Sequence, residues 1–127
     1  MNAPDTFAAR WVRRFACAGR GLRYVLICEP CGRVHMGALL AVAVLGGWLS
    51  VTTLEWAVLA LAAAGVIAAE AFNTAVERLA DRVSLEREES IRLVKDVAAG
   101  GVLATAIGAV IAGLAILGPK LWTLVFS

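Results

Sequence analysis

The sequence predicts an all-α integral membrane protein, and two observations carry this prediction. Of the 127 residues, 61% are hydrophobic, whereas only about half of a soluble domain is apolar. Two runs, 34–54 and 97–117, contain no Asp, Glu, Lys or Arg, and each can cross a hydrocarbon core of about 30 Å at about 1.5 Å per residue. The length predicts a single domain, 1–127, and the net charge of +2 indicates no nucleic-acid partner.

The first predicted element is an amphipathic helix over 7–28 that lies on the membrane surface. Its arginines occupy other sides than its apolar residues, which recur three and four positions apart and are Trp11, Phe15, Ala18, Leu22 and Val25. Such a helix either anchors the chain in the interface or walls a site at the lipid surface, and the pattern favours neither role. Pro30 and Gly32 then break the helix before the first span.

Three membrane-spanning helices are predicted next, over 34–54, 56–76 and 97–117. The second continues to about residue 82 and is interrupted by polar side chains. The stretch before the first span and the connection between the second and third are rich in Arg and Lys, whereas residues 50–55 contain neither. Because basic loops stay in the cytoplasm, we expect the N-terminus inside and the C-terminus outside. The N-terminus lacks the pattern of a cleaved signal peptide, so we expect an uncleaved chain.

The third span carries small residues at helical spacing. They form two adjacent rows, namely Gly100, Ala104, Gly108 and Ala112, and Gly101, Thr105, Ala109 and Gly113. Rows of this kind let helices approach closely in lipid. Three short helices enclose little interior, so we expect identical chains to associate through this span. The alternative is that these residues are apolar filler in an alanine-rich chain.

One side of the second span is polar, although the preceding residues Trp56–Ala69 carry no charge. An ionisable group costs about 2.5–3.5 kcal/mol at the bilayer centre, so carboxylates here are better explained by function than by stability. The side chains fall within an arc of about 80°. We call them the polar stripe, which consists of Glu70, Asn73, Glu77 and Asp81.

The polar stripe runs from within the bilayer toward the cytoplasm, where a lipid head group and a water-soluble compound can meet. Its carboxylates suit Mg²⁺, which proteins usually hold with one or two carboxylates and substrate phosphates. Glu29 is expected at the membrane level of Glu77, and Lys95 and Asp96 add a cation and an acid there. The alternative, ion pairs in a solvated loop, suits residues 86–92 but not polar residues inside an apolar span.

The cysteines give little indication of a site. Cys28 and Cys31 have the C-x-x-C spacing and His35 follows, but a zinc site usually needs a second pair of ligands. Together with Cys17 the count is odd, so no disulfide framework is expected. We therefore favour three incidental thiols over a metal or redox centre.

Four segments carry a resemblance that extends over about residues 15–120. They are Ala18-x-x-Gly21-Leu22, Glu29-x-x-x-Arg33, Glu70-Ala-Phe-Asn73-Thr-Ala-Val-Glu77-Arg-Leu-Ala-Asp81-Arg and, fourteen residues after Asp81, Lys95-Asp96-Val-Ala-Ala-Gly100. This combination closely resembles the signature of the small prokaryotic diacylglycerol kinase/undecaprenol kinase family. The resemblance implies a homotrimer of three-span subunits in a bacterial inner membrane, with active sites between subunits.

The resemblance also implies transfer of the ATP γ-phosphoryl group to a lipid hydroxyl, of diacylglycerol or undecaprenol, at the cytoplasmic interface. Glu70 would be the general base, and Glu29 and Glu77 would bind Mg²⁺. Asp81 would line the nucleotide side. The residues that would position substrate and nucleotide are Asn73, Lys95 and Asp96.

The chain departs from the family in one segment. Residues 85–94 are more charged than the related loops and lack their usual His, so no nucleotide contacts are assigned there. The chain also lacks a P-loop motif, so nucleotide would bind without one. His35 and residues 97–103 resemble the undecaprenol branch, although His35 equally suits an interfacial side chain. The acceptor lipid therefore stays open.

Two other function classes compete with a lipid kinase. A small transporter subunit would use Glu70 as a proton-coupled site. Transport sites usually lie near the midplane with polar groups from several spans, whereas the acids here gather at one end of one span. A structural or regulatory membrane peptide would leave Glu70 and Asn73 unexplained.

Overall fold

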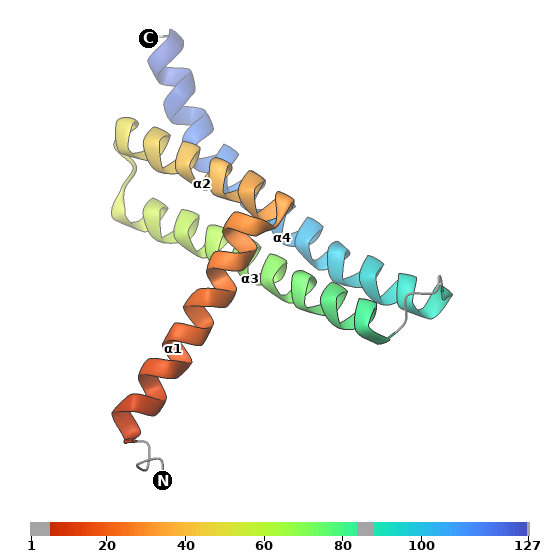
Figure 1. Ribbon diagram of the computed structural model, residues 1–127. Helices are drawn as coiled ribbons and strands as arrows, with labels where there is room; N and C mark the ends of the chain where they lie inside the picture. Colours follow the sequence, from red (N-terminus) through yellow and green to blue (C-terminus); the bar gives the residue numbers. More distant parts are fainter. Residues whose placement is uncertain (1–5, 84–87, 127) are drawn as a thin grey trace.

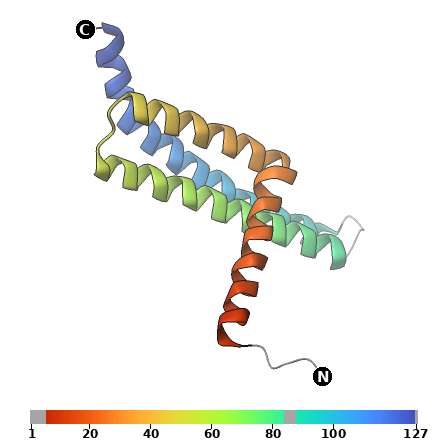
Figure 2. The same cartoon turned by 60° about the vertical axis from the view of Figure 1, so that its left-hand side comes forward.

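The structure is a computed structural model that describes residues 6–83 and 88–126. Within these ranges the chain forms helices and connecting turns and no strand. The elements are, in order, α1 (Phe7–Arg23), the π-helical turn η1 (Tyr24–Cys28), α2 (Pro30–Trp48), α3 (Thr53–Val83) and α4 (Glu89–Phe126). Helices α2, α3 and α4 lie alongside one another, and α1 projects away from them (Figure 1 and Figure 2).

Three of these helices, α2, α3 and α4, are long and apolar enough to cross a membrane. This confirms the prediction of an all-helical chain with three spans. At about 1.5 Å per residue, the 19 residues of α2 reach about 28 Å, close to the thickness of a hydrocarbon core. The 31 residues of α3 and the 38 residues of α4 make both helices long enough to project beyond that core.

Helix α2 ends before the predicted limit of the first span, at Trp48 rather than at residue 54, and α3 begins at Thr53. Ser50 leaves the helical conformation with φ 52°, and a capping box fixes where α3 begins. The Glu55 carboxylate accepts a hydrogen bond from the Thr52 N–H at 2.7 Å, and the Thr52 hydroxyl accepts one from the Glu55 N–H at 3.4 Å. Because these bonds satisfy N–H groups at a helix start, the uncharged run is divided between two helices.

Helix α4 extends past the third predicted span, 97–117, at both ends. The prediction counted only uncharged residues, whereas the helix continues through polar turns. Pro119 lies inside α4 and cannot donate a backbone hydrogen bond to the carbonyl of Ala115, which its ring also crowds. The C-terminal part of α4 accordingly turns away from α3 (Figure 1).

A sharp reversal joins η1 to the first span. Glu29 has an extended backbone (φ −83°, ψ 134°) and Pro30 occupies the first turn of α2, a position that suits proline because its fixed φ matches the helix. Gly32 lies so close to η1 that an added Cβ would be 1.8 Å from the Val25 carbonyl oxygen. Glycine therefore permits the close packing of α2 on η1.

Helix α1 keeps its large apolar side chains exposed, and none of residues 7–23 is buried. Phe7, Trp11 and Phe15 form a row in which successive ring centroids are 6.1 and 6.0 Å apart. An aromatic row of this kind is available to lipid acyl chains. The location of α1 on a membrane surface stays a prediction.

Candidate functional site

Glu70, the first residue of the polar stripe, faces α2. It is 5% exposed, and its Oε1 lies 3.5 Å from Nε2 of His35. This separation is within ion-pair range, but Oε1 makes no hydrogen bond with any described residue. A buried carboxylate oxygen without a hydrogen bond is costly. The oxygen is therefore available to a bound ligand.

Asn73 and Glu77 form the next pair along α3. Asn73 Nδ2 donates to Glu77 Oε1 at 3.1 Å, which is the contact expected of residues four positions apart on a helix. Asn73 Oδ1 is buried and also lacks a hydrogen bond among residues 6–83 and 88–126. Since most buried polar atoms are paired with protein, water or a ligand, the unpaired oxygens of Glu70 and Asn73 mark one stretch of α3 as a binding surface.

Glu29 reaches α3 from the reversal between η1 and α2. Its Oε1 accepts a charge-assisted hydrogen bond from Arg78 Nη2 at 3.0 Å, and the Tyr24 hydroxyl accepts one from the same nitrogen. The guanidinium also lies over the Tyr24 ring, 5.1 Å from its centroid. Arg78 thus ties the end of the N-terminal helical segment to α3.

The carboxylates of Glu29, Glu70 and Glu77 gather around the start of α2. Cys31, in the first turn of α2, lies within electrostatic range of all three. The three cysteines of the chain are free thiols, and each is exposed. The structure therefore places the predicted base and both predicted magnesium ligands in one region, around the first turn of α2.

Asp81 and Lys95 connect α3 to α4, and Lys95 Nζ forms an ion pair with Asp81 Oδ1. Both predicted residues therefore lie side by side at the last turns of α3. Asp96 is exposed on α4, and no ion pair or hydrogen bond joins its side chain to another described residue. Residues 85–87 of the segment 85–94 lie outside the residues that the structure describes, and 88–94 lie within them.

No group of three or more His, Cys, Asp and Glu side chains in the described part of the chain is arranged to hold a metal ion. This does not conflict with a magnesium–nucleotide site, because Mg²⁺ usually takes one or two carboxylates together with phosphates. Glu29, Glu77 and the unpaired Asn73 Oδ1 offer hard oxygen atoms of the right kind. Arg78 competes for Glu29, so it must release that carboxylate when a cation binds.

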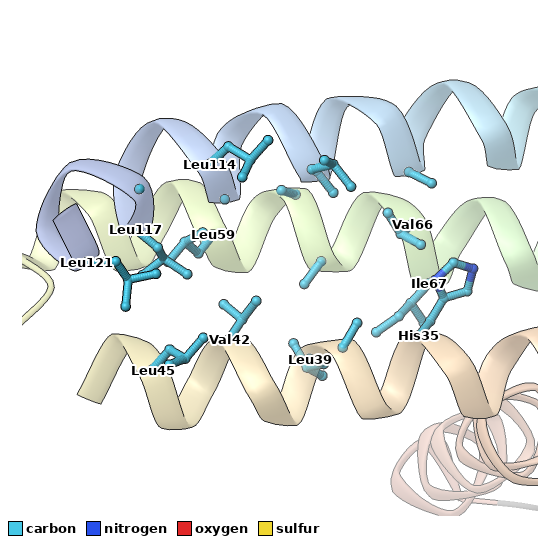
Figure 3. Close-up of a pocket in the computed structure, with 18 residues that line it drawn as sticks. His35, Leu39, Val42, Leu45, Leu59, Val66, Ile67, Leu114, Leu117 and Leu121 are labelled. Atoms are coloured by element: carbon cyan, nitrogen blue, oxygen red, sulfur yellow. The ribbon is translucent and has the colours of Figure 1, made fainter. Parts of the chain in front are cut away.

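An apolar cavity of 470 Å³ opens between α2, α3 and α4. Figure 3 shows His35 at one end of it, beside Val66 and Ile67 of α3. His35 is the single polar residue among those that line the cavity, and the others include Leu39, Val42, Leu59, Leu114 and Leu117. The cavity is thus apolar along its length and meets a polar group at the end where Glu70 lies.

Sequence reasoning identifies the polar stripe but misses two contacts that join other elements to α3. The contact of His35 with Glu70 depends on how α2 packs against α3, for which the sequence carries no local signal. The ion pair of Arg78 with Glu29 also joins distant segments, and the basic residues of the connection between the second and third spans indicate only its membrane side. The capping box had a signal, since Thr52-x-x-Glu55 is its sequence signature.

Comparisons with known proteins point to one family. The sequence model of prokaryotic diacylglycerol kinase matches residues 16–117. An undecaprenol kinase of Bacillus subtilis (strain 168) is 32% identical over 112 residues, which are 88% of this chain and 91% of that protein. A diacylglycerol kinase of Synechocystis sp. (strain PCC 6803) is 36% identical over 111 residues, 87% of this chain but 63% of that longer protein.

Proposed function

Because the chain belongs to the prokaryotic diacylglycerol kinase family and is a membrane lipid kinase, we propose that it transfers the γ-phosphoryl group of ATP to the hydroxyl of a membrane lipid. The observation that supports a particular site is the burial of the Glu70 carboxylate. This side chain is 5% exposed, lies in a helix long enough to span a membrane and has an oxygen without a hydrogen bond among described residues. The transporter alternative is not supported by these relatives, which are kinases.

In the proposed reaction Glu70 acts as general base. Its Oε1 takes the proton of the lipid hydroxyl while the hydroxyl oxygen attacks the γ-phosphorus. The bond from the γ-phosphorus to the oxygen it shares with the β-phosphate breaks, and ADP leaves. General bases of this kind contribute about 10²- to 10⁴-fold to a rate. Positioning and charge neutralisation supply most of the remainder in phosphoryl transfer.

The nucleotide side of the site is assigned to residues nearer the end of α3. Glu29 and Glu77 would hold Mg²⁺, with Asn73 Oδ1 beside them. When bound, Mg²⁺ neutralises charge on the ATP phosphates. Lys95 lies next to Asp81 and would pair with a phosphate. Asp96 would help to position the nucleotide from α4.

The acceptor is proposed to be diacylglycerol or undecaprenol, since the two relatives are named for these two lipids. The apolar cavity beside His35 suits a segment of the hydrocarbon chain of either one. We further propose that the protein is a homotrimer with active sites between subunits. It would lie in a bacterial inner membrane, with its N-terminus and its site on the cytoplasmic side.

The test is phosphoryl transfer by purified, detergent-solubilised protein from γ-labelled ATP, with diacylglycerol and undecaprenol assayed side by side. We expect Mg²⁺-dependent labelling of at least one lipid. Glu70→Gln should lower kcat by at least about 100-fold, because it removes the proton acceptor without changing side-chain size. Glu89→Gln is the matched control, since Glu89 is exposed and pairs only with the adjacent-turn Arg92 among described residues. Full turnover by a correctly assembled Glu70→Gln variant would exclude Glu70 as the base.

A further inference from the structure

His35 occupies the point where the apolar cavity reaches Glu70. Its Nε2 is 3.5 Å from Glu70 Oε1, and its side chain is 23% exposed. It comes from α2, whereas the polar stripe belongs to α3. A side chain from a second helix can fix the direction in which the Glu70 carboxylate points. No described residue of α3 donates a hydrogen bond to Glu70 Oε1.

We propose that His35 is the positioning residue for Glu70. It holds the carboxylate at the end of the cavity, with Oε1 directed toward the place that a lipid hydroxyl would occupy. This inference rests on the proposed role of Glu70 as general base. It assigns to the proposed reaction a residue that neither the polar stripe nor the magnesium ligands include.

The other donors of the site are engaged elsewhere. The amide nitrogen of Asn73 donates to Glu77, Arg78 pairs with Glu29, and Lys95 pairs with Asp81. Besides His35, the thiol of Cys31 also lies close enough to Glu70 to donate a hydrogen bond to its carboxylate. A thiol is a weak donor, so His35 is the stronger candidate to orient the carboxylate.

The chemistry of imidazole suits this role in either charge state. A neutral His carries one N–H, which can be placed on Nε2, and the protonated form carries an N–H on both nitrogens. The present distance of 3.5 Å is longer than a formed hydrogen bond, and Oε1 is unpaired. Contacts of this kind are often loose in a substrate-free enzyme and tighten in the reactive complex.

The experiment uses the full-length protein in detergent with its lipid substrate and compares His35→Ala, His35→Gln and Cys31→Ala. His35→Ala should lower kcat about 10- to 100-fold, the usual cost of losing a partner that orients a reactive group, while KM for ATP stays within about twofold. His35→Gln keeps an N–H donor and should recover part of kcat. Cys31→Ala should retain nearly full activity.

A double-mutant cycle separates positioning from an independent role. Glu70→Asp moves the carboxylate away from His35, so adding His35→Ala to it should cost much less than it costs the wild-type protein. Val34→Ala is the control, because Val34 precedes His35 on α2 and is 70% exposed. Thermal melting checks that each variant folds. If His35→Ala does not fold, kcat of His35→Gln is compared with kcat of His35→Met, which lacks an N–H donor. A higher kcat for His35→Gln supports the inference, and equal values overturn it.

Three results would overturn the inference: unchanged kcat in folded His35→Ala, additive losses in the double variant, or an equal loss in Cys31→Ala. These are distinct from failure of the proposed function, which would show as no Mg²⁺-dependent labelling of either lipid by the wild-type protein. They are also distinct from loss of the base assignment, which full activity of Glu70→Gln would indicate.

Discussion

At the scale of single residues, the site is organised by what each carboxylate contacts. Glu77 accepts from Asn73, Glu29 from Arg78 and Asp81 from Lys95, whereas Glu70 Oε1 accepts from no described residue. Glu29 and Asp81 are paired with a cation, whereas Glu77 accepts only from a neutral amide and keeps the charge that attracts a cation. Glu70 differs from these acids because it is buried and its Oε1 lacks a hydrogen bond, which suits a group that accepts a proton from a ligand. Four acids of similar chemistry are thus separated in role by their neighbours.

The assignment of Glu77 to Mg²⁺ leads to a prediction. Glu77→Gln keeps an oxygen that can accept from Asn73 but removes the charge that attracts a cation. We expect the Mg²⁺ concentration for half-maximal activity to rise at least about tenfold, equivalent to about 1.4 kcal/mol, while KM for the lipid is unchanged. Titrations of activity against Mg²⁺ measure this effect, with Glu89→Gln as control. A raised lipid KM with normal Mg²⁺ dependence would move Glu77 to the lipid side of the site.

At the scale of helices, the sequence predicts which helices form better than it predicts where each helix begins and ends. The three spans follow from apolar composition, and all three are present. The end of the first span could not be found from hydropathy because residues 34–54 are uniformly uncharged, and a capping box divides them at Thr52. The stripe on α3 was predictable because its residues share one helix face. Its partners on α2 and η1 were not, because they depend on tertiary packing.

The close packing of α2 on η1 leads to a prediction with an internal control. In Gly32→Ala the new Cβ would lie 1.8 Å from the backbone oxygen of Val25, so η1 and α2 must separate. We expect a loss of about 1–3 kcal/mol in stability, or more, and lower activity, since Glu29 lies in the same reversal. Thermal melting and kinase assays measure both. Gly37→Ala, on the same helix with no atom within 4 Å of the added Cβ, should be as stable as wild type or slightly more so.

At the scale of the whole molecule, a single chain covers little of itself. Its accessible surface is 9498 Å², whereas a compact soluble protein of 13.3 kDa would expose about 6,500 Å². Lipid can cover part of this surface, and identical chains can cover the rest. The two rows of small residues on α4 differ in this respect. Ala109 and Gly113 line the internal cavity, whereas Gly100, Ala104 and Gly108 are exposed.

The exposed row therefore predicts where subunits meet. Ala104→Leu would place a large side chain on the row, and Ala99→Leu makes the same change at an exposed position about 140° away around α4. Because small residues allow close approach of helices in lipid, Ala104→Leu should weaken trimer association by at least about tenfold, or about 1.4 kcal/mol. Ala99→Leu should leave association intact.

Sedimentation in detergent and photobleaching of labelled subunits in bilayers measure the subunit number. Activity should fall together with trimer content if active sites lie between subunits. Full assembly of Ala104→Leu, or equal dissociation of Ala99→Leu, would place the subunit contact on another face of the molecule.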